Sequence, residues 1–198
     1  MARRAKGVLT TERLALREFR DGDAEPLYRL HADPRVMRYI GDGSIGTRAS
    51  VVAAVERSIR YYDTYPGLGV WPAEDRFTGE FVGWFCLKYV PETVEVEVGY
   101  RLAPTAWGRG YATEGARSVV RYGFADLGLD RIIGLTHPDN AASQRVLQKA
   151  GLKDSGWGNY YRRRLRLFVA DAEDASGAVV SRAERNDAPR PPPGYDLP

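Results

Sequence analysis

The sequence contains little cysteine, histidine or methionine, and it has no long hydrophobic run. Its 198 residues include one cysteine, two histidines and two methionines. The single thiol, Cys86, excludes an internal disulfide, and with no cluster of cysteine and histidine no metal site is expected. No apolar stretch approaches the roughly 18–20 residues that span a bilayer, so no membrane segment is expected.

Cys86 lies in an apolar pattern typical of a strand, residues 81–89, which predicts a buried and unreactive thiol. The first seven residues are basic, but no apolar signal core follows them, so secretion is not expected. Both observations favour a reducing cytoplasm as the location of the protein.

Charge is distributed unevenly along the chain. The whole sequence carries a formal net charge of +3, while residues 171–198 hold six acidic and three basic side chains, a net of −3. Residues 1–170 therefore carry +6, which suits a polyanionic nucleotide ligand but is also common without one. The last residues are rich in proline, alanine and charge, so we predict one folded domain over 9–171 and a disordered tail over 172–198.

The hydrophobic period changes within residues 94–127. Apolar and polar residues alternate over 94–102, as in a half-buried strand. The apolar residues then recur at steps of three and four, which predicts an amphipathic helix over 111–127. Between them, Gly108 and Gly110 would let a ligand approach the backbone, and the unpaired N–H groups of a helix start favour an anion. The segment predicts a phosphate site, although such turns also serve simply to pack a helix on a strand.

Three separate motifs follow one another in this chain. The opening stretch from Leu9, LTTERLALREFRDGDAEPLYRLH, is followed by WGRGYATE at 107–114 and by NAASQRVLQKAGL at 140–152. In this order they resemble the first strand and helices, the cofactor motif and the late Asn-x-x-Ser-x-Arg-Val-Leu element of the GNAT acetyltransferase superfamily. The second motif, with Trp107 at a position usually held by Gln or Arg, resembles the RimJ/RimL-type branch. The resemblance extends to about Ala170.

The fold class expected from pattern and resemblance together is α/β (mixed α+β). The resemblance implies the GNAT fold, a central mixed, mostly antiparallel sheet that is splayed between its fourth and fifth strands and flanked by helices. Strands are expected over 14–19, 70–73, 81–89, 94–102, 132–136, 153–156 and 165–170. Helices are expected from Asp21 or Asp23 to 32, at Pro34, from Thr47 or Ser50 to 62, over 111–127, and over 141–150 with Gly151 as its left-handed cap.

The resemblance implies acetyl-CoA as the co-substrate. Main-chain N–H groups from Gly108 to Ala112 would hold its diphosphate, and an N–H near Val98 or Gly99 would hold the oxyanion. Gly99 marks either a bulge or close backbone approach, or a packing accommodation. The cofactor-binding residues implied are Val98, Tyr100, Leu102, Gly108, Arg109, Gly110, Tyr111, Ala112, Asn140 and Ser143. From its position alone, Asn140 is also a candidate for the N-cap of the following helix.

The resemblance also implies the groups that move protons. Many relatives use a tyrosine as the acid at the position of Leu147, which cannot donate a proton. Ser143 matches the serine proposed in RimL-type enzymes and is the expected catalytic acid, against a plain helix-surface serine and against a tyrosine from 157–161. Glu97 is the expected catalytic base, against a solvated outward carboxylate like Glu95.

The acceptor is expected to be an amine that loses its proton easily. Deprotonating a lysine at pH 7 costs roughly 4.6 kcal/mol, whereas an α-amine costs only about 1–1.4 kcal/mol. We therefore expect the acceptor to be an N-terminal α-amine or a small-molecule amine. An enzyme that acetylates an antibiotic is a third alternative. The competing hypothesis is a non-catalytic acyl-CoA-binding module or sensor of the same fold.

For several remaining residues we expect a structural rather than a functional role. In the basic run from Arg162 to Arg166, Arg164 and Arg166 alternate with apolar residues. This pattern favours one charged face of a strand over a site for an acidic acceptor or for ribosomal docking, and over nucleic-acid binding. Trp71 and Trp84 are expected in the core, and His31 is expected as a surface or packing residue rather than a base. Nucleic acid is not an expected partner. The sequence leaves open the acceptor's identity and the oligomeric state, for which a homodimer is one option.

Overall fold

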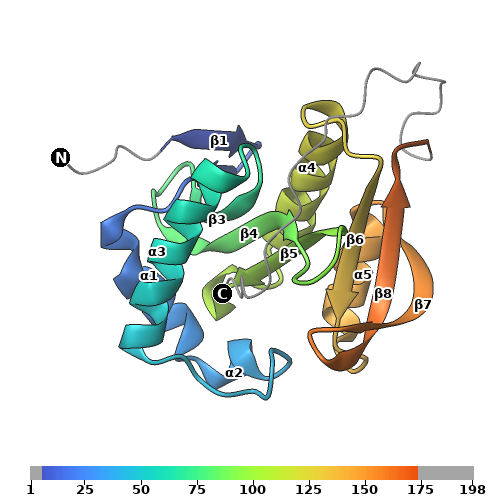
Figure 1. Ribbon diagram of the computed structural model, residues 1–198. Coiled ribbons are helices and arrows are strands. Elements are labelled where there is room, and N and C mark those ends of the chain that lie inside the picture. The colour runs from blue at the N-terminus through green and yellow to red at the C-terminus, as the bar shows by residue number, and fades with distance from the viewer. Residues whose placement is uncertain (1–5, 174–198) are drawn as a thin grey trace.

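The computed structural model describes residues 6–173 of the chain. They form one eight-stranded sheet with helices on both faces (Figure 1). The predicted disordered tail lies outside the described residues, apart from 172 and 173. No helix within residues 6–173 is long and apolar enough to cross a membrane. The same part of the chain holds no cluster of three or more potential metal ligands.

The strands lie across the sheet in the order β1-β2-β3-β4-β5-β6-β8-β7. Neighbouring strands are antiparallel except β5 and β6, which run parallel. The strands are β1 (Gly7–Thr10), β2 (Leu14–Arg17), β3 (Gly69–Asp75), β4 (Phe81–Tyr89), β5 (Val96–Leu102), β6 (Arg131–Thr136), β7 (Lys153–Tyr160) and β8 (Arg163–Asp171). The predicted mixed, mostly antiparallel sheet is confirmed.

The helices divide between the two faces of this sheet. They are α1 (Ala24–His31), α2 (Pro34–Met37), α3 (Arg48–Thr64), α4 (Tyr111–Ala125) and α5 (Ala141–Lys149), with short 3-10 turns η1 (Asp21–Asp23) and η2 (Pro104–Ala106). Apolar residues of α1 and α3 pack with Val70, Trp84 and Cys86 on one face. Residues of α4 and α5 pack in the larger core on the other face (Figure 1). Both faces of β4 and β5 are therefore covered.

The sheet opens between β5 and β6. These two strands are registered at one position, Glu97 opposite Ile133. Beyond it they diverge, and β6, β8 and β7 form a separate wing in Figure 1. The predicted splay is confirmed, since β5 and β6 are the strands predicted at 94–102 and 132–136.

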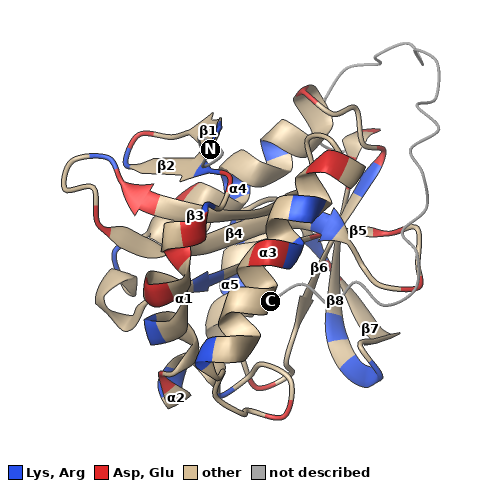
Figure 2. Cartoon of the chain, turned by 60° about the vertical axis from the view of Figure 1, so that its left-hand side comes forward, with Lys and Arg blue, Asp and Glu red and all other residues tan. Residues whose placement is uncertain are grey.

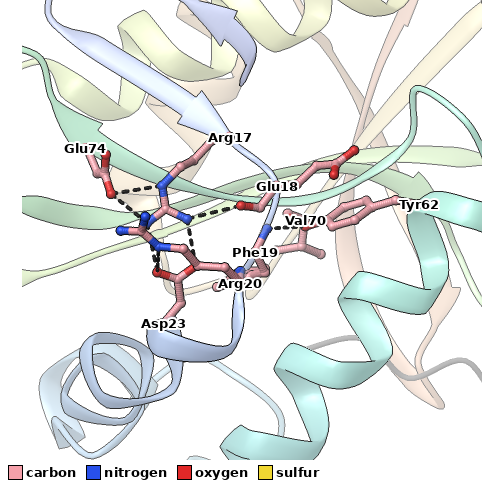
Figure 3. A network of polar contacts seen from close by, with 8 residues as sticks. All are labelled: Arg17, Glu18, Phe19, Arg20, Asp23, Tyr62, Val70 and Glu74. Atoms are coloured by element: carbon pink, nitrogen blue, oxygen red, sulfur yellow. Dashed lines mark hydrogen bonds and ion pairs between the residues drawn. The ribbon is translucent and has the colours of Figure 1, made fainter. Parts of the chain in front are cut away.

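A polar network fixes the link from β2 to α1. The Arg17 guanidinium donates to both carboxylate oxygens of Asp23 at 2.7 and 2.8 Å and to Glu74 Oε1 at 2.6 Å (Figure 3). Beside it, the Tyr62 hydroxyl accepts from the Phe19 N–H at 3.1 Å and donates to the Val70 carbonyl. The charge-assisted bonds of Arg17 are stronger than neutral ones and hold the start of α1 against the sheet, while the neutral bonds of Tyr62 connect α3 to β3.

Two predicted helix caps are confirmed, whereas Asp23 stands at the N-cap of α1 without a capping hydrogen bond from its side chain. Thr47 caps α3, with its Oγ1 accepting from the Ser50 N–H at 3.1 Å. After α5, Gly151 adopts a left-handed φ of 102°. The Leu152 N–H then donates to the Leu147 carbonyl at 3.1 Å, which completes a Schellman motif.

One strand was not predicted and others were wrong in extent. β1 (Gly7–Thr10) was missed because this short, partly exposed edge strand has four residues that give no alternation to detect. The strand predicted over 14–19 is β2, which ends at Arg17. The strand predicted over 94–102 begins at Val96 and is not half-buried, because helices cover both of its faces. The two last strands are longer than predicted and meet in a tight turn at 161–162.

Candidate active site

The turn before α4 depends on two left-handed glycines. Gly108 has a φ of 72° and Gly110, the residue at the N-cap of α4, a φ of 83°. A Cβ at Gly108 would meet no protein atom within 4 Å, whereas one at Gly110 would lie 3.2 Å from Arg13 Nη2. No side chain caps the helix start. The turn therefore presents main-chain N–H groups at the positive end of the α4 dipole, which fits an anionic ligand.

Basic side chains surround this turn. Arg13 forms an ion pair with Glu114 at 2.7 Å and donates to the Arg109 carbonyl at 2.8 Å. Arg13 and Arg109 lie on the Tyr111 ring, at 4.8 and 4.9 Å from its centroid. The Arg109 side chain is exposed and Ala112 is half-buried. Because Glu114 pairs with Arg13, Arg109 is the cation left exposed beside the turn, where it suits a diphosphate.

The side chain of Tyr111 points away from this turn. It is buried, and its hydroxyl donates to Asp75 in the β3–β4 turn. That bond, joined by main-chain N–H groups of the turn, lowers the pKa of Asp75. Only the backbone of Tyr111 is left to contact a ligand.

On the α4 and α5 face of β5, a tyrosine and a serine meet. Val98 and Leu102 are buried in the core, and Tyr100 between them donates from its hydroxyl to Ser143 Oγ at 3.1 Å. Burial raises the pKa of Tyr100 to about 12, so the phenol stays protonated. Sequence reasoning assigned only the backbone of Tyr100 and missed this hydroxyl, although the strand alternation puts its side chain on this face.

Asn140 and Ser143 are joined at the start of α5. Asn140 is the N-cap, and its Oδ1 accepts from the Ser143 N–H at 3.1 Å. Leu147, at the position where relatives carry a tyrosine, is buried. The hydroxyl groups brought together here are therefore those of Ser143 and Tyr100.

The opposite face of β5 carries Glu97, and the picture of a solvated, exposed carboxylate is wrong. Glu97 is buried and pairs with Lys88 Nζ at 2.6 Å. Lys88 lies opposite Glu97 in the β4–β5 register. The Tyr161 hydroxyl donates to Glu97 and accepts from Lys88 at 2.8 Å. Sequence reasoning missed Lys88, whose signal was one basic residue within an otherwise apolar strand.

Tyr161 reaches this group from the tip of the β7–β8 hairpin. Tyr161 and Arg162 are the two residues between the paired Tyr160 and Arg163, and they have φ values of 52° and 56°. Left-handed conformations at both positions are typical of a type I′ turn and are strained for residues other than glycine. The turn places a phenol over the strand that carries Glu97.

Gly99 lies between Glu97 and the end of β5, and Cys86 lies opposite it on β4. The β4–β5 register is continuous through Gly99, so the alternative of a bulge there is wrong. A Cβ on Gly99 would lie 3.0 Å from Cys86 Sγ, and this supports the packing alternative. Burial raises the pKa of the Cys86 thiol to about 12, which confirms the predicted unreactive state.

A second buried cation lies further along the same face. Arg101 is opposite Trp84, and its guanidinium lies 5.0 Å from that ring. Its Nη1 is 2.8 Å from His31 Nε2, to which Trp84 Nε1 also points at 3.4 Å. Burial, with a contribution from the Arg101 charge, lowers the pKa of His31 to about 3, so His31 is neutral and accepts at Nε2. The expected packing role of His31 and the core position of Trp84 are confirmed.

The basic run at the start of β8 forms one side of a hairpin. Arg164 and Arg166 lie on the Trp157 ring, 4.6 and 5.2 Å from its centroid. Arg166 also pairs with Asp154 across the hairpin. Basic residues colour the ribbon near the hairpin end of β7 and β8 in Figure 2. This arrangement supports the strand-face interpretation of the run.

Comparison with known proteins identifies relatives over most of the chain. Residues 13–153 match the family model described as acetyltransferase (GNAT) domain. The FsC-acetyl coenzyme A-N(2)-transacetylase of Aspergillus fumigatus is 36% identical over 160 residues, which are 77% of this chain and 67% of that protein.

Solved structures share the fold. A GNAT-family acetyltransferase from Bacillus anthracis superposes with a TM-score of 0.72 at 24% identity, over 83% of this chain and 98% of that one. RimJ of Mycobacterium smegmatis, in complex with a CoA disulfide, gives 0.70 at 20% identity over 88% of each chain.

Proposed function

This chain belongs to the GNAT acetyltransferase family, whose co-substrate is acetyl-CoA, and on that premise we propose that it acetylates a primary amine by direct attack on the thioester. The acceptor is either a peptide N-terminal α-amine or a small-molecule amine. The observation that carries the proposal is the position of Glu97. Its carboxylate is on β5 at the one position where β5 is registered with β6, beside the opening of the sheet.

The residues of the α4 turn fit the diphosphate of the co-substrate. The N–H groups from Gly108 to Ala112 are uncapped by side chains, and Arg109 is exposed beside them. Beyond Glu97, the edge of β5 facing β6 has no registered strand partner among the described residues, so its main chain can pair with an extended ligand. When bound, acetyl-CoA supplies an activated acetyl carbon.

Protein groups then handle the charge and the protons. A main-chain N–H at Val98 or Gly99 would stabilise negative charge on the carbonyl oxygen. Glu97 would take the proton of the amine, and Ser143, hydrogen-bonded to Tyr100, would supply a proton to the departing thiolate.

The pairing of Glu97 bears on the acceptor. Glu97 is the one carboxylate assigned as a base, and its Oε1 already accepts from Lys88 and Tyr161. A single carboxylate engaged in this way suits an amine that costs about 1–1.4 kcal/mol to deprotonate at pH 7 rather than the roughly 4.6 kcal/mol of a lysine side chain. This supports an α-amine or a small-molecule amine of lowered pKa.

The test is a measurement of thiol release from acetyl-CoA. The full chain would be supplied with peptides that carry free or blocked N-termini, and with small amines. We expect release with free α-amines or small amines and none with the blocked peptides. Acetylation of internal lysines alone would refute the assignment.

The same pairing gives the non-catalytic hypothesis its support. Glu97 is held by two partners, and Leu147 cannot act as an acid. A binding module would bind acetyl-CoA in a calorimeter and release no thiol with any amine of the panel. The cytoplasmic location and the homodimer stay predictions.

A further inference from the structure

Arg101 is a buried cation whose charge no described residue neutralises. Its side chain is almost inaccessible, with a relative exposure of 8% for the residue. Among residues 6–173 its one hydrogen-bonding neighbour is His31 Nε2, and its Nε has no partner. Because His31 is neutral, it satisfies an N–H group without balancing the charge. Trp84 contributes only its ring face.

Two other cations among residues 6–173 have carboxylate partners. Buried Lys88, on the same face of the sheet, pairs with Glu97, and half-buried Arg17 pairs with Asp23 and Glu74. Leaving a charge buried without a counter-ion is costly, and proteins normally pair such groups. The exception at Arg101 indicates that its counter-ion comes from a ligand.

Arg101 lies on the same strand face as Glu97, the proposed base, so a ligand bound to Arg101 would lie near the reacting groups. Glu97, Gly99 and Arg101 alternate along β5 and so share the face beneath α1 and α3. At roughly 3.3 Å per residue, the Cα atoms of Glu97 and Arg101 are about 13 Å apart, and both side chains are long. Gly99 carries no side chain, and Cys86 Sγ lies over it. A ligand bound to Arg101 would therefore lie on the same face of β5 as Glu97.

We propose that Arg101 binds a carboxylate of the acceptor, so that the acceptor is an amine that also carries a carboxylate group. This rests on the proposed function, because it assigns the substrate class of the same site. The planar fork of a guanidinium matches the two oxygens of a carboxylate, and Nε is the unused donor of that fork. A phosphate dianion fits less well, since Lys88, the other buried cation on this face, is already paired.

The carboxylate has two sources that one experiment separates. It is either the α-carboxylate of a free amino acid or the side chain of an acidic residue at or near a peptide N-terminus. The full chain would be assayed for thiol release with leucine against leucinamide, and with the peptides Glu-Ala-amide and Asp-Ala-amide against Gln-Ala-amide and Asn-Ala-amide. Each kcat/KM is referred to the concentration of unprotonated amine, because a free α-carboxylate raises the pKa of its own amine.

We expect one of these sets to show a preference for the carboxylate member of about ten- to a hundredfold in kcat/KM, the range of a hydrogen bond to a charged group. In Arg101→Met the preference should disappear, and in Arg101→Lys, which keeps the charge but not the fork, it should be partial. The matched control is Arg164→Met, on the exposed face of β8, which should keep the preference of the parent.

Stability gives a second readout that separates binding from folding. Because Arg101 is a buried cation that has no counter-ion among the described residues, its removal should leave the thermal midpoint of Arg101→Met within a few degrees of that of the parent. A collapse of that midpoint would mean that Arg101 supports the fold instead. The proposal can also be overturned without any variant. Equal kcat/KM values of the parent chain for the two members of every substrate pair would overturn it.

Failure of this inference and failure of the proposed function look different. Turnover without a carboxylate preference rejects the inference and keeps the acetyltransferase. If no amine is turned over, calorimetry with coenzyme A and each pair decides: carboxylate-dependent binding that is lost in Arg101→Met upholds the inference. Absence of any such binding overturns it.

Discussion

The two faces of β5 hold different kinds of site. Under α4 and α5, the proposed ligand contacts are main-chain N–H groups around Gly108 and Gly110 and the paired hydroxyls of Tyr100 and Ser143. Under α1 and α3, the groups are buried charges, one paired at Glu97 and one not paired by any described residue at Arg101. The first site depends on backbone conformation, and the second depends on which distant side chains are brought together. The predictions below test that division.

The largest effect is expected from Glu97→Gln on the charged face. The change keeps the shape of the side chain and removes its basicity, so kcat should fall about 10²–10⁴-fold while the affinity for coenzyme A is unchanged. Steady-state thiol release and calorimetry measure the two quantities. Glu95→Gln, on a half-exposed carboxylate that accepts from Tyr160, is the control and should leave kcat near that of the parent. An unchanged kcat in Glu97→Gln would mean that Glu97 is not the catalytic base.

On the other face, Tyr100→Phe and Ser143→Ala should each lower kcat about tenfold or more, because each removes one member of a hydrogen-bonded pair. If the pair acts as one proton donor, the double variant should be no slower than the slower single variant. Tyr122→Phe, which loses only a bond to the Gly67 carbonyl, controls for the loss of a phenol. Multiplying effects in the double variant would show that the two hydroxyls act separately.

Two left-handed glycines test whether the α4 turn binds through its backbone. Gly108 and Gly128 have φ values of 72° and 64°, and a Cβ on either meets no protein atom within 4 Å. Substitution by alanine should therefore lower the free energy of unfolding by a similar amount at both positions, about 1–2 kcal/mol. Only Gly108→Ala should also weaken coenzyme A binding, by about tenfold in a calorimeter, since its Cβ would stand in front of the turn. Equal affinities in the two variants would argue against a phosphate site here.

The smallest effect concerns His31 beside Arg101. The pKa of His31 is about 3 in the folded chain and about 6.5 when unfolded, so its stabilising contribution is complete above the unfolded value. As the pH falls, the unfolded chain binds a proton that the folded chain does not, and stability falls by about 1.4 kcal/mol per unit between about pH 5.5 and 4. Denaturant titrations should show a shallower decline for His31→Gln. Parallel curves would mean that native His31 takes up the proton.

Local signals predicted much of the fold. The change of period after residue 102, the cap at Thr47 and the left-handed Gly151 each act over a few residues, so the sequence contains the whole cause. The Gly108–Gly110 turn belongs to the same class. Its left-handed conformations are dictated by glycine, and the helix that follows begins immediately.

The charged face could not be predicted in this way. The alternation of Val96 and Glu97 has the same pattern whether or not a helix covers the polar side, so Glu97 looked exposed. Its partners are 9 residues before it, through the strand register, and 64 residues after it, through the β7–β8 turn. Only tertiary packing decides such contacts, and the same holds for the meeting of Arg101 with His31.

The two-residue β7–β8 turn constrains how this chain can change. With Tyr160 paired to Arg163, one added or deleted residue would shift the strand register and send alternate side chains to the other face. Tyr161 would then lose Glu97. Length variation among functional homologues should therefore be rare at this turn, whereas exchange of the Arg162 side chain should be frequent, because no described contact fixes that side chain.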